Sequence, residues 1–234
     1  MTPPNQLLPN APQQRTRIKM CGFTRETDVL AAVLAGADAI GFVLYPPSPR
    51  SVSIERAAAL ARLLPAFVTP VLLFVNETPE RIQAACTAVP GAMLQFHGDE
   101  TPEFCAAMSQ ATGRTHLKAA RIPLTEAASF DLVKFANFHQ QAQALLLDAH
   151  VDGYGGGGKT FNWSLLPPNV NAHLVLSGGL TPANVADGIR ALRSRGLSLA
   201  VDVSSGIEAD KGLKDAEKIQ QFVAAVRAAD ADLL

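Results

Sequence analysis

The chain of 234 residues carries 20 lysines and arginines against 21 aspartates and glutamates, so its formal net charge is −1. This balance excludes the basic surface that nucleic-acid binding or binding to a membrane surface requires. Hydrophobic residues make up 48% and charged residues 18%, which excludes a globally disordered chain. We therefore expect a folded protein whose partners include neither nucleic acid nor membrane.

The cysteine content and the length of the apolar runs predict the cellular location of the protein. Three cysteines are an odd and small number for a secreted disulfide scaffold, so we predict a reducing, cytoplasmic location. No apolar stretch reaches the roughly 18 residues of a membrane span. Residues 1–16 are rich in Pro and Gln and lack an apolar signal core. We predict that they form a short disordered N-terminal extension, followed by one domain over residues 17–234.

From residue 17 onwards one pattern repeats: a short apolar run, a glycine-containing or polar turn, then an amphipathic helix. The apolar runs predict eight strands, beginning near residues 17, 37, 70, 92, 115, 144, 173 and 197. The seven steps between the first and the last start, 197 minus 17, average about 26 residues. That is the length of one βα unit with its turns.

Four segments carry apolar residues at the i, i+3, i+4, i+7 spacing of an amphipathic helix. These stripes are Ile54, Ala57, Ala58 and Ala61; Ile82, Ala85, Cys86 and Val89; Phe104, Ala107, Met108 and Ala111; and Ile219, Phe222, Val223 and Val226. Thr78-Pro79, Thr101-Pro102 and Thr181-Pro182 each predict a helix start, because the hydroxyl can cap the helix and proline fits its first position. Between the sixth and seventh strands only residues 163–166 favour a helix, so that helix should be short.

Eight strands alternating with helices fit either a closed (β/α)₈ barrel or an open doubly wound sheet. The near-equal units and the lack of a dinucleotide-binding glycine motif after the first strand favour the barrel. We predict an α/β protein with a single (β/α)₈ TIM barrel. Its functional site should lie where the strands have their C-terminal ends.

Strand alternation places a thiol at this mouth of the barrel. In the first strand, RIKMC, Ile18 and Met20 should face the helices, whereas Lys19 and Cys21 should face inward. The Lys19 ammonium would favour the thiolate of Cys21, which can act as a base or a nucleophile. Alternatively, Cys21 is a small buried core residue, the role that we assign to Cys86 and Cys105.

Acidic and imidazole side chains end three other strands. Asp148 closes the apolar run ALLLD, a pattern that favours an acid or a base at the mouth, although a turn or capping aspartate has the same pattern. Asp202, near the end of LAVDV, could equally be a structural acceptor for backbone N–H groups. His97, in QFHG, lies at the rim either as a functional group or as a hydrogen-bonded scaffold residue.

Two glycine-containing turns follow the seventh and eighth strands, where barrel enzymes often bind phosphate. They are residues 177–179, Ser-Gly-Gly, and residues 204–206, Ser-Ser-Gly. Glycine lets the backbone approach an anion closely, and N–H groups at a helix start can hold it. A need for positive φ in a tight turn would explain the same glycines.

Two loops complete the predicted site. Arg50 projects from a proline-rich loop after the second strand, either as a carboxylate ligand or as a solvated surface side chain. Residues 154–159 contain four consecutive glycines and are predicted to be a mobile lid or a merely flexible loop. The sequence has no metal-ligand cluster and no nucleotide motif, so we expect no metal and no cofactor. The pattern predicts proton transfer on a small phosphorylated molecule.

Six motifs resemble, in order, those of the phosphoribosylanthranilate isomerases of tryptophan biosynthesis. They are KMCGFTR, GFVLYPPSPRSV, QFHGDE, LLLDAHVDGYGGGGKTFNW, LSGGLTPANV and DVSSGIE, and the resemblance covers residues 17–230. It implies a (β/α)₈ barrel that needs no cofactor. The implied reaction is the Amadori rearrangement of N-(5-phosphoribosyl)anthranilate to 1-(2-carboxyphenylamino)-1-deoxyribulose 5-phosphate.

The resemblance also implies roles for single residues. Cys21 is implied to be the general base that removes the C2′ proton, and Asp148 the general acid that protonates the furanose ring oxygen. Arg50 is implied to hold the anthranilate carboxylate, while His97 and Asp202 line the substrate site. The implied phosphate-binding residues are Gly178, Gly179, Ser204, Ser205 and Gly206. The oligomeric state, monomer or homodimer, stays open.

Two alternative functions remain. The aminoaldose isomerase of histidine biosynthesis performs the same rearrangement on the same fold, but it is expected to carry aspartates at the ends of strands 1 and 5. Here the first strand ends in Cys21 and the fifth runs HLKAAR. A barrel that only binds a sugar phosphate would keep the glycine turns and lose the acid or the base, whereas this chain has both Cys21 and Asp148.

Overall fold

The computed structural model describes residues 15–124, 130–149, 160, 162–163 and 166–232. Eight parallel strands follow one another around a closed barrel, in which the last strand pairs with the first. These strands are β1 (Arg17–Cys21), β2 (Ala39–Val43), β3 (Thr69–Phe74), β4 (Met93–Phe96), β5 (His116–Ile122), β6 (Ala144–Ala149), β7 (His173–Leu176) and β8 (Ser198–Val203). Each begins within two residues of its predicted start, and the predicted (β/α)₈ barrel is confirmed.

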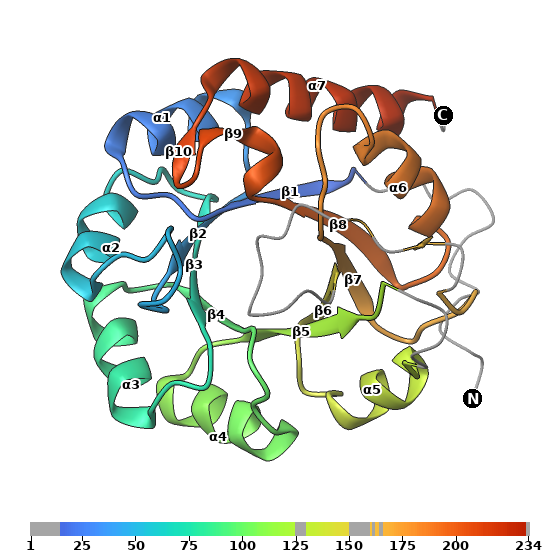
Figure 1. Cartoon of the computed structure of the whole chain (residues 1–234). Helices are drawn as coiled ribbons and strands as arrows, with labels where there is room; N and C mark the ends of the chain where they lie inside the picture. Colours follow the sequence, from blue (N-terminus) through green and yellow to red (C-terminus); the bar gives the residue numbers. More distant parts are fainter. Residues whose placement is uncertain (1–14, 125–129, 150–159, 161, 164–165, 233–234) are drawn as a thin grey trace.

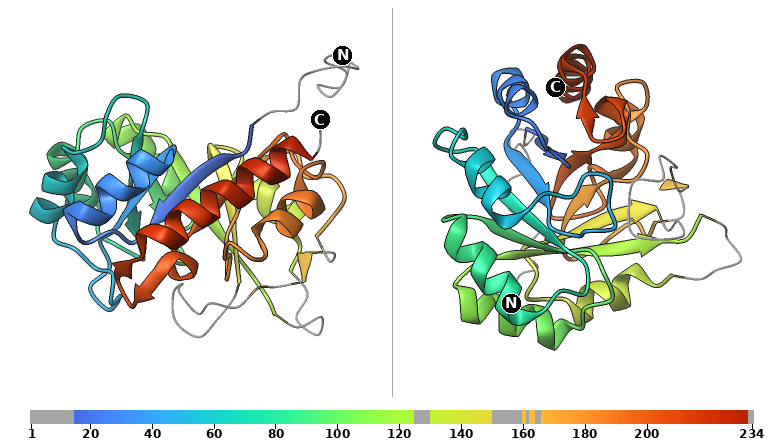
Figure 2. Two further views of the ribbon diagram at one scale, coloured as in Figure 1. Left: turned by 90° about the horizontal axis from the view of Figure 1, so that it is seen from above. Right: turned by 60° about the vertical axis from the view of Figure 1, so that its left-hand side comes forward.

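Helices surround the barrel on its outside (Figure 1). In the described part of the chain they are α1 (Glu26–Ala35), α2 (Ile54–Ala61), α3 (Pro79–Ala88), α4 (Pro102–Thr112), α5 (Leu132–Phe138), α6 (Val185–Leu192) and α7 (Ala216–Ala231). The long helix α7 packs between α1 and α6 (Figure 2). The predicted lid at 154–159 and residues 164–165 of the predicted short helix lie outside the described residues.

Strand side chains alternate between two apolar layers. The layer between strands and helices holds large, fully buried side chains, among them Ile18, Met20, Phe42, Phe74 and Phe96. The barrel interior is filled by smaller ones: Val71, Leu117, Ala119, Ala144, Leu146 and Val175. The predicted outward direction of Ile18 and Met20 is therefore confirmed.

Helix starts follow the predicted capping pattern in two of three places. The Thr78 and Thr101 hydroxyls accept hydrogen bonds from the N–H groups of Arg81 and Phe104, so α3 and α4 begin as predicted. The third start is wrong, because α6 begins at Val185. Asn184 Oδ1 accepts the Thr181 N–H at 2.8 Å and Asn184 Nδ2 donates to Gly179 O at 3.0 Å, so a turn over residues 182–184 precedes the helix.

The predicted apolar stripe of α4 is partly wrong. Ala107 and Ala111 are exposed, whereas Cys105 is fully buried beside Met108. Alanines do not distinguish an exposed from a buried helix face, so the larger Phe104, Cys105 and Met108 decide which side packs. Cys105 and Cys86 both lie in the layer between helices and barrel, which agrees with their predicted role as core residues.

Thr16, the last residue of the predicted extension, already contacts the barrel. It is fully buried, its N–H and hydroxyl donate to the Asp230 carboxylate at 3.0 and 2.6 Å, and its hydroxyl accepts from Arg193 at 2.8 Å. Arg227 donates to the Thr16 carbonyl oxygen at 2.8 Å. Although burial alone would raise it, the bonds from Thr16 and Arg193 hold the pKa of Asp230 below its ordinary value.

Thr16→Val should lower the free energy of unfolding by about 1–3 kcal/mol, because the methyl group leaves buried polar partners unsatisfied. Urea titration followed by circular dichroism measures this loss. Thr87→Val, at an exposed position on α3, is the matched control and should stay within about 0.5 kcal/mol of the parent chain. Equal stability of both variants would show that the Thr16 cluster does not anchor the start of β1.

No helix in the described ranges is both long and apolar enough to cross a membrane.

Candidate active site

The C-terminal end of β1 places Cys21 at the mouth of the barrel. The side chain is 5% exposed and packs with Val43, Leu73, Val75 and Tyr45. Gly41 on the neighbouring strand makes room for it, since a Cβ on Gly41 would lie 2.6 Å from the Cys21 sulfur. The predicted inward direction of the thiol is confirmed, and Gly41 is a supporting residue that sequence reasoning missed.

Beneath the thiol, Lys19 and Asp202 form a buried ion pair across the β1–β8 register. The Lys19 Nζ donates to Asp202 Oδ1 at 2.8 Å, and both side chains are about 95% buried. The Ser177 hydroxyl donates to the other Asp202 oxygen at 3.4 Å. The donors to Asp202 are side chains, not the backbone N–H groups expected of a purely structural aspartate.

The charges around Cys21 oppose the effect of its burial. Burial raises the pKa of the Cys21 thiol above its ordinary value, while the ammonium groups of Lys19 and Lys214 favour the thiolate and the Asp202 carboxylate disfavours it. The net direction is upward, because the effect of burial exceeds the effect of the two ammonium groups. Deprotonation of the thiol therefore increases as the pH rises.

Across the mouth from β1, three side chains form a hydrogen-bonded row: Gln95 on β4, His97 directly after β4, and Asp148 on β6. His97 Nε2 lies 2.9 Å from Asp148 Oδ2, and His97 Nδ1 lies 2.9 Å from Gln95 Nε2. The second Asp148 oxygen, Oδ1, accepts the Ala149 N–H at 3.0 Å. All three side chains are buried. His97 therefore contacts the predicted acid directly, and Gln95, which sequence reasoning did not single out, orients the imidazole.

The two glycine turns lie side by side. Gly178 and Gly179 both have positive φ, 77° and 64°, so any other residue there would be strained. A Cβ on Gly206 would lie 1.9 Å from Leu180 O, which shows how closely the turn after β8 packs on the turn after β7. Ser205 and Gly206 form a single 3₁₀ turn, whereas the Ser204 hydroxyl donates to Cys21 O and is committed to β1.

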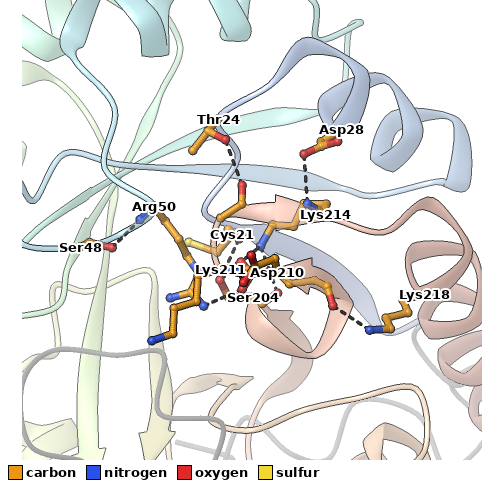
Figure 3. A network of polar contacts seen from close by, with 12 residues as sticks. Cys21, Thr24, Asp28, Ser48, Arg50, Ser204, Asp210, Lys211, Lys214 and Lys218 are labelled. Atoms are coloured by element: carbon orange, nitrogen blue, oxygen red, sulfur yellow. Dashed lines mark hydrogen bonds and ion pairs between the residues drawn. The ribbon is translucent and has the colours of Figure 1, made fainter.

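Arg50 is not a solvated surface side chain, since it is only 8% exposed. Its Nε and Nη2 donate to the two Glu208 oxygens at 2.7 and 2.8 Å, and Lys214 Nζ donates to Glu208 Oε1 at 2.8 Å. Figure 3 shows Arg50 and Lys214 close to Cys21 and Ser204. Sequence reasoning missed Glu208 and Lys214; the glutamate ending DVSSGIE was a visible but unused signal.

The mouth thus combines a thiol, a carboxyl group with an imidazole partner, a buried guanidinium and two adjoining glycine turns. Such a set can give and take protons next to an anionic ligand. Among the described residues no group of three or more His, Cys, Asp or Glu side chains is placed to hold a metal ion.

Comparison with known proteins gives the same family as the motifs. The family model of N-(5′-phosphoribosyl)anthranilate isomerase matches residues 18–225. The N-(5′-phosphoribosyl)anthranilate isomerase of Methylibium petroleiphilum is 59% identical over 217 residues, 93% of this chain and 96% of that protein. The crystal structure of phosphoribosyl anthranilate isomerase from Thermotoga maritima is 39% identical, with a TM-score of 0.79, over 91% of this chain and 99% of that chain.

Two further crystal structures of the family concern a bound ligand and an assembly. Each is 36% identical to this chain and covers 91% of this chain and 99% of the other. One is phosphoribosyl anthranilate isomerase in complex with reduced 1-(o-carboxyphenylamino)-1-deoxyribulose 5-phosphate, with a TM-score of 0.73. The other describes monomers of the dimeric Thermotoga maritima enzyme, with a TM-score of 0.74. The chain therefore belongs to the N-(5′-phosphoribosyl)anthranilate isomerase family.

Proposed function

We propose that this chain isomerises N-(5′-phosphoribosyl)anthranilate to 1-(2-carboxyphenylamino)-1-deoxyribulose 5-phosphate by general acid–base catalysis. Family membership supports the reaction. The observation that carries the assignment of roles is the placement of Cys21 and Asp148, both buried at the same mouth of the barrel, beside two glycine turns. The domain from residue 17 to 234 is proposed to carry the whole activity.

In the proposed first step Asp148 protonates the furanose ring oxygen. The C1′–O bond breaks, the ring oxygen leaves as a hydroxyl group, and the nitrogen lone pair forms a protonated imine at C1′. His97, 2.9 Å from Asp148 Oδ2, and the Ala149 N–H, 3.0 Å from Oδ1, stabilise the carboxylate that remains.

In the second step the thiolate of Cys21 removes the C2′ proton. The electrons of the C–H bond form a C1′=C2′ double bond, and the imine nitrogen becomes a neutral amine. The resulting enol becomes the ketone when its hydroxyl loses a proton and C1′ gains one. Transfer of one proton from the thiol to Asp148 through solvent restores the enzyme, and all atoms and charges balance.

Other residues are proposed to hold the parts of the substrate that do not react. Gly178, Gly179 and the 3₁₀ turn at Ser205 and Gly206 would receive the phosphate on backbone N–H groups. The Ser204 hydroxyl is engaged by β1, so only its backbone is proposed to take part. The remaining guanidinium N–H groups of Arg50 would bind the anthranilate carboxylate.

A fluorescence assay with freshly prepared phosphoribosylanthranilate tests the proposal. The signal should fall much faster with the protein than without it, while the histidine-pathway aminoaldose at equal concentration should turn over far more slowly. Comparable rates on both substrates would indicate a dual-substrate enzyme. Tight binding without turnover would favour a barrel that only binds a sugar phosphate.

Arg50→Ala should raise KM more than it lowers kcat, because the guanidinium holds a group that does not react. Steady-state kinetics with the same assay separate the two parameters. Arg62→Ala, which removes an exposed arginine beyond the end of α2, is the control and should change neither. A loss mainly in kcat would show that Arg50 takes part in the chemistry instead.

A homodimer is the assembly that the opposite end of the barrel supports. There a cavity of about 630 Å³ opens between the N-terminal ends of the strands, with Val71, Leu117 and Val175 in its lining. Phe67, in the loop before β3, stands at its edge, fully exposed and with a positive φ of 70°. Such a conformation costs a non-glycine residue free energy, which burial in a second copy would offset. We propose that Phe67 of each protomer enters the cavity of the other.

Phe67→Glu should therefore convert a dimer to a monomer, as measured by light scattering after size-exclusion chromatography. Leu34→Glu is the matched control, since Leu34 is 87% exposed on α1, and it should leave the mass unchanged. A monomeric parent chain at every concentration, or a Phe67→Glu variant that stays dimeric, would contradict this assembly.

We also propose a cytoplasmic location, because Cys21, Cys86 and Cys105 are free thiols, as a reducing compartment would keep them.

A further inference from the structure

We propose that Glu208 is a positioning residue that assigns one edge of the Arg50 guanidinium to the protein and leaves the other edge to the carboxylate of the substrate. The inference rests on the proposed function, because it concerns how that substrate is held. Glu208 touches no reacting atom in this account and acts through Arg50.

The geometry of the contact between Arg50 and Glu208 is the first observation that supports this proposal. Glu208 Oε1 accepts Arg50 Nε–H at 2.7 Å and Oε2 accepts Nη2–H at 2.8 Å, a side-on bidentate pair. Within the described part of the chain, all hydrogen bonds of the Arg50 guanidinium go to Glu208. A second carboxylate must therefore approach the edge formed by Nη1 and the second N–H of Nη2. Glu208 thus determines which way the anthranilate ring can point.

Burial makes this arrangement rigid. The exposed fractions of the side chains are 10% for Arg50, 5% for Glu208 and 0% for Lys214. Lys214 Nζ donates to Glu208 Oε1 at 2.8 Å. It also donates to Ser204 O at 3.0 Å, and Figure 3 shows Lys214 and Ser204 together. A buried carboxylate shared by two cations cannot rotate away without leaving both cations unpaired. The guanidinium is consequently oriented before any ligand arrives, which reduces the entropy lost on binding.

Side chains from two helices hold the backbone of the hairpin that carries Glu208. Glu208 belongs to β9 (Glu208–Asp210), which pairs with β10 (Leu213–Lys214) after the 3₁₀ turn η3 (Ser205–Ile207). Lys218, on α7, donates to Glu208 O at 2.7 Å, and the Lys214 N–H donates to Asp28 on α1 at 3.1 Å. The hairpin that carries the carboxylate is therefore fixed to the outer layer of the barrel.

Two product analogues distinguish positioning from simple stabilisation of the fold. One is the reduced carboxyphenylamino-deoxyribulose phosphate, and the other is the same compound with phenyl in place of carboxyphenyl. In calorimetric titrations Glu208→Gln should bind the carboxylated analogue at least about tenfold more weakly, a loss of about 1.4 kcal/mol. Its affinity for the phenyl analogue should stay within about threefold, because phosphate and ribulose contacts are unchanged.

A double-mutant cycle makes the test specific. In an Arg50→Ala background, Glu208→Gln should cause no further loss for the carboxylated analogue, because the group on which it acts is absent. Glu217→Gln, an exposed glutamate on α7, is the matched control and should bind both analogues like the parent chain. If Glu208→Gln does not fold, Glu208→Asp replaces it and should give the same pattern, because its side chain is one methylene shorter: it keeps a negative charge near Lys214 but no longer reaches both guanidinium nitrogens.

Equal losses for both analogues, or an additive loss in the Arg50→Ala background, would overturn the proposal and leave Glu208 a structural residue. No loss for either analogue would overturn it too. Failure of the proposed function gives a different result, since the parent chain itself would then neither bind the carboxylated analogue nor turn over phosphoribosylanthranilate.

Discussion

Asp148→Asn is expected to lower kcat at least about 10²-fold, in line with the removal of a general acid. Asparagine is nearly isosteric and its oxygen can still accept the Ala149 N–H, but the amide has no proton to give to the ring oxygen. Affinity for the reduced product analogue should stay within about tenfold, because its binding does not require proton transfer. Steady-state kinetics and calorimetry measure the two quantities.

Asp187→Asn is the control for this change, since it makes the same replacement at an exposed carboxylate on α6. It should leave both quantities unaltered. If Asp148→Asn turned over within about threefold of the parent chain, the acid would be another group. Asp202, whose Oδ1 accepts a hydrogen bond from Lys19 at 2.8 Å, would then be the next candidate.

Cys21→Ala is the second change with a large expected effect, a fall in kcat of about 10²-fold or more with little change in KM. The thiolate acts only when the C2′ proton leaves, so its loss should not weaken binding of the substrate in the ground state. Cys86→Ala, at a buried thiol on α3 outside the site, controls for the loss of a cysteine as such. Near-normal turnover of Cys21→Ala would end the assignment of Cys21 as the base.

Strand positions could be predicted from the sequence because one physical rule sets them. A strand buried on its helix-facing side needs large apolar residues at every second position, as Ile18 and Met20 show in β1. The same alternation correctly directed Lys19 and Cys21 inward. Closure of the barrel followed from the number of repeated units and did not require any knowledge of long-range contacts.

The starts and faces of helices were harder to predict, because competing local bonds decide them. Thr181 has the same threonine–proline pattern as Thr78 and Thr101, yet a turn over residues 182–184, in which the Asn184 amide accepts the Thr181 N–H, precedes α6. In α4, periodicity selected two alanines that lie exposed. Small residues carry too little apolar surface to determine which face is buried.

The partner of Arg50 could not be predicted from the spacing of residues in the sequence. Arg50 and Glu208 are 158 residues apart, and only the closed barrel brings them within 2.7 Å. The balance of charges at Cys21 has the same origin. Lys19 was foreseen as a neighbour, but the effect of burial, which raises the pKa of the thiol, depends on packing by Val43, Leu73 and Val75.

The most direct test of the acid–base account is the pH profile of kcat for the parent chain, Cys21→Ala and Asp148→Asn, measured side by side. The parent chain should give a bell, because one group must be deprotonated and the other protonated. The residual activity of Asp148→Asn should lose the descending limb and rise with pH through the raised pKa of Cys21, since thiolate accumulates in that direction. Cys21→Ala should lose the ascending limb and keep the descending one. A variant that retains both limbs would show that the residue replaced in it is neither the acid nor the base, and would contradict the account.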